Sequence, residues 1–165
     1  LFCLPTISYS TNFVRTKTIA MNRQQFKTTI NAPREKVWRI LWDDATYREW
    51  TSAFHPGSHA VTDWKKGSKV IFGDGTGNGM VSRIEENIQN EYMSIEHLGE
   101  VKDGVEDTTS DRVKQWAGAH ENYTLKDNNG VTELIVDMDL TEEFAEMFRE
   151  IWPKALAKVK ELAEK

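Results

Sequence analysis

The strongest limit on the possible folds comes from the end of the chain, which has the pattern of one long amphipathic helix. Apolar residues recur at helical spacing over the range Phe144–Leu162. Thr141 is a suitable N-cap residue, and acidic residues follow it where the helix dipole is positive. Pro153 cannot donate a backbone hydrogen bond, so we expect a kink there. Such a helix must bury its apolar face against a second layer of structure.

The rest of the sequence predicts that this second layer is an antiparallel sheet. Alternation over residues 26–30 indicates a first strand, and two short helices are expected over residues 33–42 and 47–50. Short strands and turns then run from His55 to Leu140, with a strong hairpin signal at Asn128-Asn129-Gly130. This order predicts an α+β fold, in which a curved antiparallel sheet wraps around the long C-terminal helix.

Composition excludes several classes of protein. The formal net charge of −5 argues against a general nucleic-acid binder, and a single cysteine cannot form an internal disulfide. The sequence has no apolar run of the roughly 20 residues that span a bilayer. We therefore expect a cytoplasmic protein without a membrane span.

The first twenty residues differ from the remainder. Residues 1–20 contain no acidic side chain and hold the only cysteine, Cys3. Met21 then opens a chain of ordinary composition. We expect residues 1–20 to be a non-native or disordered leader and residues 21–165 to form a single domain.

A set of motifs resembles a known superfamily. Ile30-Asn31-Ala32-Pro33-Arg34-Glu35-Lys36-Val37-Trp38 is similar to the opening of SRPBCC domains, which include the START domains and the birch-pollen allergen. Further marks resemble the bacterial branch that is like the activator of the ninety-kilodalton heat-shock protein's ATPase. These marks are Tyr47 with Trp50, Thr62-Asp63-Trp64, His97-Leu98-Gly99, Tyr123-Thr124-Leu125 and Trp152. The resemblance implies a helix-grip domain with a cavity for an apolar or amphipathic small molecule.

Strand alternation predicts which side chains would line that cavity. The residues expected to point from the sheet toward the long helix are Phe72, Met80, Ile84, Met93, Ile95, Tyr123, Leu125, Leu134, Val136 and Met138. Those expected to point back from the helix are Phe144, Phe148, Ile151 and Trp152. The competing interpretation is that these residues fill a solid core. Trp116 and a polar, mobile loop over residues 99–114 are expected near one entrance.

Two polar residues share faces with this apolar set. His97 alternates with Met93 and Ile95, and Glu121 alternates with Tyr123. If both faces are inward, a histidine and a carboxylate enter an apolar space, where they could act as general acid and base or orient a ligand head group. A structural pair, or a bulge that turns Glu121 toward solvent, is the remaining possibility.

Two further patterns suggest metal sites and are better explained otherwise. The spacing from Asp74 to Glu85 matches part of an EF-hand loop, but strands should flank it, which favours a hairpin turn. His55 and His59 are four residues apart, but Pro56 interrupts the helix that would align them. We expect no metal and no cofactor.

Three functions are compatible with these features. The first is binding of a small hydrophobic or amphipathic molecule between sheet and helix. The second is an enzyme of the polyketide cyclase or hydratase type that uses His97 and Glu121. The third is an interaction module that assists a chaperone ATPase. The sequence favours the first and leaves the ligand and the oligomeric state open.

Overall fold

The computed structural model describes residues 20–165. The predicted leader, residues 1–20, lies outside this part of the chain except for Ala20. In chain order the elements are β1 (Met21–Ile30), α1 (Arg34–Trp42), α2 (Asp44–Thr51), β2 (His59–Val61), β3 (Lys69–Gly73), β4 (Gly79–Ile88), β5 (Tyr92–Lys102), β6 (Val105–Asp107), α3 (Asp111–Lys114), β7 (His120–Asn128), β8 (Val131–Thr141) and α4 (Glu142–Glu164).

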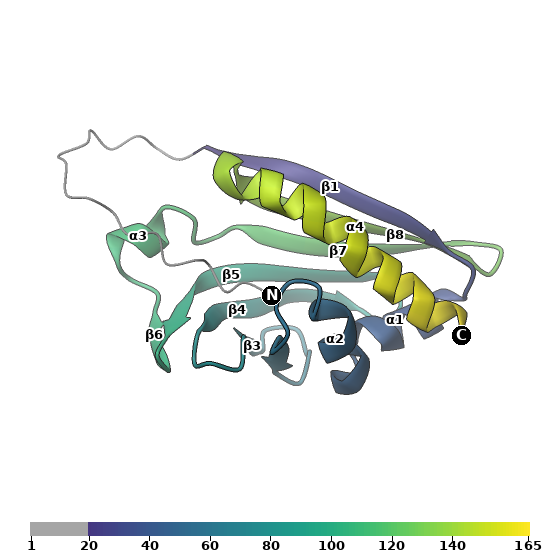
Figure 1. The fold of residues 1–165 in the computed structure, drawn as a ribbon, viewed down its shortest axis with the longest axis horizontal. Helices are drawn as coiled ribbons and strands as arrows, with labels where there is room; N and C mark the ends of the chain where they lie inside the picture. Colours follow the sequence, from purple (N-terminus) through teal and green to yellow (C-terminus); the bar gives the residue numbers. More distant parts are fainter. Residues whose placement is uncertain (1–19) are drawn as a thin grey trace.

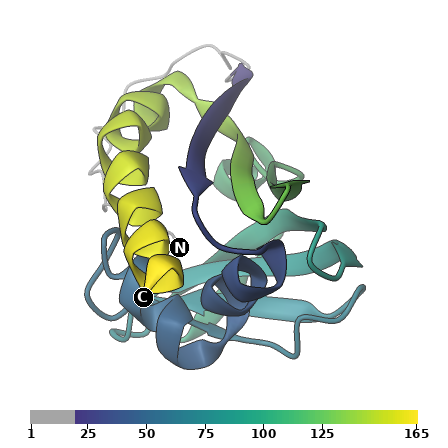
Figure 2. The same ribbon diagram turned by 90° about the vertical axis from the view of Figure 1, so that its right-hand side faces the viewer.

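The strands of residues 20–165 form one antiparallel sheet in the order β1-β8-β7-β5-β4-β3-β2, with β6 paired to β5. The sheet curls around α4 when the molecule is viewed from its end (Figure 2). Helices α1 and α2 pack beside α4, where α1 contacts β7 and β8 and α2 contacts β2 (Figure 1). This arrangement confirms the predicted α+β helix-grip fold.

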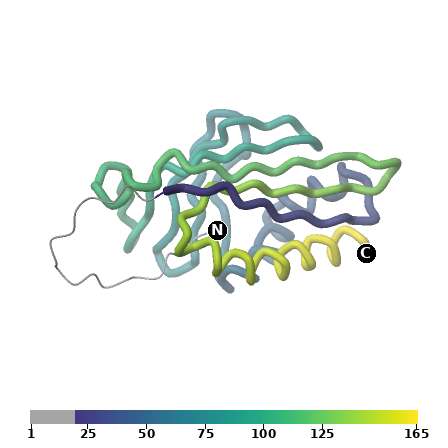
Figure 3. The backbone as a smooth tube through the Cα atoms, turned by 90° about the horizontal axis from the view of Figure 1, so that it is seen from above, coloured from purple at the N-terminus to yellow at the C-terminus, as the bar shows by residue number. Residues whose placement is uncertain are grey.

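Helix α4 holds the layers together. It contacts β1, β8, α1 and α2, and it runs alongside β1 when seen from above (Figure 3). Its buried face contains Trp152, whose ring lies 5.6 Å from that of Phe26 and 6.2 Å from that of Trp50. The helix continues through Pro153, which is exposed. Thr141 is the N-cap as expected, but its side chain makes no capping hydrogen bond.

The hairpin between β7 and β8 follows directly from its turn residues. Asn129 and Gly130 have φ angles of 56° and 85°. Both values lie in the left-handed region that asparagine tolerates and glycine favours. The turn fixes the register in which Glu121 lies opposite Met138, so the positions on β7 alternate between the two faces of the sheet as predicted.

The segment 99–114 differs from the mobile loop that was expected. Strand β5 extends to Lys102 and pairs with β6, and α3 follows. Asp103 and Gly104 make the turn with φ angles of 50° and 78°. The side chain of Arg112 forms an ion pair with that of Glu100, which anchors α3 to β5. The polar composition of this segment reflects a short, exposed hairpin rather than an absence of structure.

Candidate functional site

A buried histidine and a buried carboxylate meet on the inner face of the sheet. His97 lies on β5 and Glu121 on the neighbouring strand β7, and they are 4% and 2% exposed. The distance between His97 Nε2 and Glu121 Oε2 is 3.4 Å, which is within ion-pair range. Both side chains are thus buried, which was the condition for placing a histidine and a carboxylate together in an apolar space.

Two hydroxyl groups extend this pair into a chain of polar contacts. Ser82 Oγ on β4 is hydrogen-bonded to His97 Nδ1 at 2.9 Å. On the other side, the Tyr123 hydroxyl donates to Glu121 Oε1. A register irregularity between Val81 and Ser82 brings Ser82 opposite His97. The chain thus crosses three adjacent strands from β4 to β7.

Aromatic rings surround one end of this polar chain. We call Trp42, Tyr47, Trp64, Phe72 and Tyr123 the aromatic cluster. The ring centroid of Trp42 lies 4.8 Å from that of Tyr123 and 4.7 Å from that of Trp64. Phe72 continues the contact, with its ring centroid 6.3 Å from that of Trp64 and 6.4 Å from that of His97. The cluster therefore links α1 and α2 to the His97–Glu121 pair on the sheet.

Trp64 has an unusual backbone conformation for a bulky residue. Its φ angle is 59°, in the left-handed region that costs free energy for a side chain of this size. Asn87 Nδ2 donates to the carbonyl oxygen of Trp64 at 2.7 Å and helps to hold this conformation. Trp64 is only partly buried, so the aromatic cluster reaches the molecular surface at this residue.

The helix side of the cluster carries two buried polar atoms that lack a hydrogen-bond partner within residues 20–165. These are Tyr47 Oη and Trp42 Nε1. Burial, and secondly the nearby charge of Glu121, raise the pKa of Tyr47 well above its ordinary value. Burial and the same carboxylate also raise the pKa of Tyr123. Ring contacts also connect Tyr47 to the buried pair, because the ring centroid of Phe72 lies 6.4 Å from that of Tyr47 and 6.4 Å from that of His97.

No lysine or arginine is among the buried side chains of residues 20–165. The buried Glu100 is paired with Arg112, whereas Glu121 contacts a histidine and a tyrosine. Burial of a carboxylate is costly unless charge or hydrogen bonds compensate it. Around Glu121 the interior thus combines apolar walls with an acidic group and several hydrogen-bonding groups, which is the usual composition of a small-molecule site.

The structure places the predicted lining residues as follows. The buried ones are Phe72, Met80, Ile84, Met93, Ile95, His97, Glu121, Tyr123, Leu125, Leu134, Val136, Met138, Phe148 and Trp152. Trp116, Phe144 and Ile151 are partly buried. Phe72, His97, Glu121 and Tyr123 come together at the site, whereas Leu134 and Val136 belong to the wider core.

Sequence reasoning missed four members of the site. Ser82 was not singled out, although it alternates with the predicted lining residues Met80 and Ile84. Trp42 lies at the end of the helix predicted over residues 33–42, and Tyr47 and Trp64 were noted only as marks of the family resemblance. Tyr47 and Trp64 could have been found from the resemblance, since both belong to its marks. Their contact with the sheet depends on how α2 and the β2–β3 connection fold back over it, which no local pattern specifies.

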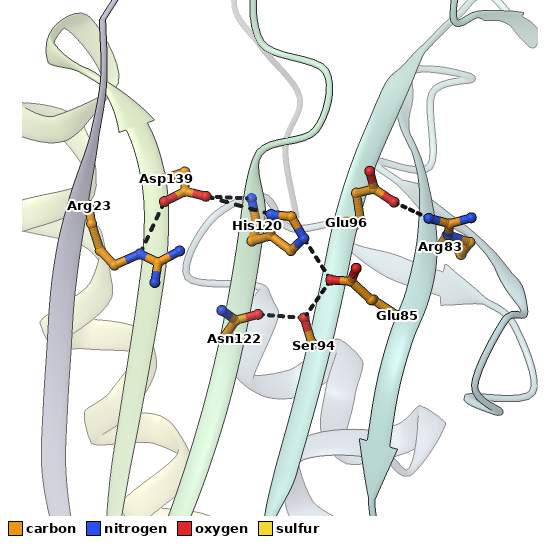
Figure 4. A network of polar contacts seen from close by, with 8 residues as sticks. All are labelled: Arg23, Arg83, Glu85, Ser94, Glu96, His120, Asn122 and Asp139. Atoms are coloured by element: carbon orange, nitrogen blue, oxygen red, sulfur yellow. Dashed lines mark hydrogen bonds and ion pairs between the residues drawn. The ribbon is translucent and has the colours of Figure 1, made fainter.

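The suspected metal-binding patterns have other partners. Asp74 accepts hydrogen bonds from Thr76 and Asn78 within the β3–β4 turn. Glu85 lies on the outer face of the sheet, where it accepts from Ser94 at 3.3 Å and contacts His120 Nε2 at 2.6 Å (Figure 4). Within residues 20–165, no group of three or more histidine, cysteine, aspartate or glutamate side chains is arranged to hold a metal ion.

The outer network in Figure 4 is separate from the buried site. His120 lies between Glu85 and Asp139, with Nδ1 3.7 Å from Asp139 Oδ2, and Arg23 also contacts Asp139 at 3.1 Å. These contacts join β4, β7, β8 and β1 across the face away from α4. They provide the partners for His120 that the sequence did not reveal, and they indicate a structural role.

The curved antiparallel sheet and the long C-terminal helix define a helix-grip domain, which is the fold of the SRPBCC superfamily and is of a ligand-binding kind. A family model described as Activator of Hsp90 ATPase homolog 1-like protein matches residues 31–164, and the chain belongs to this family. The family resemblance expected from the sequence is confirmed. A search of curated proteins finds no match.

Solved structures show the same fold at low sequence identity. Protein MLL2253 from Mesorhizobium loti is 14% identical with a TM-score of 0.67, covering 86% of this chain and 96% of that one. The Aha1 dimer from Colwellia psychrerythraea is 18% identical with a TM-score of 0.65, covering 87% and 97%. DynU16, from the dynemicin biosynthetic locus, is 14% identical with a TM-score of 0.62, covering 84% of this chain. This chain spans only 46% of DynU16.

None of the helices in residues 20–165 has the length and apolar character needed to cross a membrane.

Proposed function

We propose that this protein binds a small hydrophobic or amphipathic molecule between the sheet and the helices, with the polar end of that molecule at Glu121. The observation that carries the proposal is the buried His97–Glu121 pair, set among aromatic rings with no buried lysine or arginine in residues 20–165. A purely apolar core would avoid the desolvation cost of these groups. Their presence in the interior is explained if they recognise a ligand.

The same geometry suggests a route for the ligand. Trp64 is partly buried, while its ring contacts the buried rings of Trp42 and Phe72. A ligand that entered at Trp64 would contact the Trp64 ring first and would then replace the contacts of this ring with Trp42 and Phe72. The entrance expected near Trp116, which follows β6 and α3, stays an alternative to this route.

Native mass spectrometry of the purified protein, compared with the denatured protein, tests the proposal without a guess at the ligand. A thermal-shift screen of uncharged and amphipathic compounds complements it. We expect either a non-covalent adduct that is lost on denaturation or compounds that raise the melting temperature by several degrees. The absence of both would overturn the proposal.

A second candidate is catalysis of the cyclase or hydratase type. The contacts from Ser82 through His97 to Glu121 favour it, because they could orient an imidazole or carboxylate as a general base. The Glu121→Gln variant separates the two functions. Loss of turnover of a bound compound with affinity retained would support catalysis, whereas a protein that binds without turnover is a binding module.

A further inference from the structure

The helix side of the site offers hydrogen-bond donors that have no acceptor. Trp42 Nε1 and Tyr47 Oη have no hydrogen-bond partner within residues 20–165, and the two residues are 6% and 2% exposed. An indole N–H can only donate, and a phenol can both donate and accept. Leaving such donors buried without an acceptor costs free energy. A ligand that brings an oxygen lone pair to this place would recover that cost.

The sheet side of the site has the opposite preference. A carboxylate can only accept hydrogen bonds. Its Oε1 already accepts from the Tyr123 hydroxyl, and its Oε2 faces His97 at 3.4 Å, longer than an ordinary hydrogen bond. A ligand group that approaches Glu121 therefore gains most if it brings a proton to donate to Oε2.

These two sides together disfavour charged head groups. A carboxylate or phosphate would have to share His97 with the Glu121 carboxyl group, because no lysine or arginine is buried within residues 20–165. An ammonium group could donate to Glu121 and to the Tyr47 oxygen, but it has no lone pair for the Trp42 indole N–H, which would stay without an acceptor. A neutral hydroxyl group satisfies both sides, because its oxygen accepts from the helix side while its proton is donated to the carboxylate.

We propose that the polar end of the ligand is a neutral alcohol or phenol hydroxyl, held between Tyr47 and Glu121 with the aromatic cluster around the adjoining carbon atoms. This inference rests on the proposed function and specifies its ligand class. Because the cluster consists of five aromatic side chains, a flat hydrocarbon body fits its ring contacts.

Three probes with the same naphthalene body test the selectivity: 2-naphthol, 2-naphthoate and 2-naphthylmethylammonium, each titrated calorimetrically at pH 7. We expect 2-naphthol to bind at least tenfold more tightly than either charged probe. If all three bind within threefold of one another, or if a charged probe binds most tightly, a ligand site exists but the hydroxyl inference is wrong. If none binds, and no adduct or stabilising compound is found, both proposals fail together.

Two substitutions place the hydroxyl in the site. Tyr47→Phe should weaken 2-naphthol binding about three- to tenfold, because it removes one hydrogen bond. Its folding should be preserved, since the lost hydroxyl has no protein partner in residues 20–165. Tyr92→Phe is the matched control, because Tyr92 lies at the start of β5 outside the aromatic cluster. The Tyr92→Phe variant should bind 2-naphthol with the affinity of the wild type.

The second substitution addresses the rejection of anions. Glu121→Gln removes the negative charge but keeps a carbonyl acceptor, so the preference for 2-naphthol over 2-naphthoate should fall at least fivefold. Circular dichroism and thermal melting verify that each variant is folded. Unchanged 2-naphthol affinity in folded Tyr47→Phe, or unchanged selectivity in folded Glu121→Gln, would overturn the inference.

Discussion

At the scale of single residues, the two buried tyrosines of the site differ in what their hydroxyl groups contact. Tyr123 donates to Glu121, whereas the Tyr47 hydroxyl has no partner within residues 20–165. At pH 8, Tyr123→Phe should therefore lower the free energy of unfolding by about 1–3 kcal/mol, because it leaves a buried carboxylate oxygen without its donor. Tyr47→Phe should leave stability unchanged or slightly raised. Chemical denaturation of both variants measures the contrast, and equal destabilisation would contradict this assignment.

The same two residues determine a pH dependence. Burial raises the pKa of Tyr47 and of Tyr123 well above 10.0. Above pH 10 the unfolded chain loses tyrosine protons that the folded protein retains, so the unfolded state binds fewer protons and stability falls as pH rises. Each tyrosine contributes up to about 1.4 kcal/mol per pH unit in this range.

Denaturation curves between pH 9 and pH 11 measure this effect. The double variant Tyr47→Phe/Tyr123→Phe should lose stability less steeply than the wild type above pH 10, while the two slopes agree between pH 8 and pH 9. A double variant with the wild-type slope at pH 11 would show that the hydroxyl groups ionise as readily in the folded state as in the unfolded state.

Residue-level patterns were sufficient to predict the inward position of His97 and Glu121. Side chains along a strand alternate between the two faces of the sheet, so His97 and Glu121 each share a face with the apolar residues two positions away. The partners of this pair were less predictable. Ser82 reaches His97 through a register irregularity, and Trp64 reaches the cluster through a positive φ angle. Both features depend on contacts distant in sequence.

At the scale of secondary-structure elements, α4 contains one residue that weakens it. Pro153 has no N–H to donate to the preceding turn, and it is exposed, so it contributes little packing. Pro153→Ala should raise the free energy of unfolding by about 1–3 kcal/mol. Lys154→Ala, at the adjacent exposed position, is the matched control and should change it by less than about 0.5 kcal/mol. Destabilisation by Pro153→Ala would show instead that the sheet requires a bend in α4.

The elements also show where sequence reasoning failed and which signal was available. The hairpin at Asn129-Gly130 was predicted because its dipeptide favours a tight turn. Asp103-Gly104 is a signal of the same kind, and it does form a turn between β5 and β6. It was overlooked because the surrounding residues are polar, and a three-residue strand such as β6 shows too little alternation to be recognised.

At the scale of the whole molecule, the fold explains why one site contains groups from both layers. The sheet supplies His97, Glu121 and Tyr123, and the helices packed against it supply Trp42 and Tyr47. The apolar residues around them form a continuous buried core that extends to α4. The order of the elements and the hydrophobic pattern were enough to predict that the sheet wraps around the C-terminal helix, since few arrangements bury a long helix against an antiparallel sheet. The recognition chemistry required the three-dimensional contacts.

The central claim is that a ligand binds beside Trp42, Tyr47 and Glu121, and the tryptophan indole N–H signals test it most directly. Two-dimensional ¹H–¹⁵N spectra, assigned by single Trp→Phe variants, would be recorded during titration with 2-naphthol. Trp42 should shift most, followed by Trp64. Trp50 and Trp152 should move little, because their N–H groups already contact Leu41 O at 3.2 Å and Met138 Sδ at 2.9 Å. Saturable shifts confined to Trp38 or Trp116, with Trp42 and Trp64 unmoved, would contradict the claim.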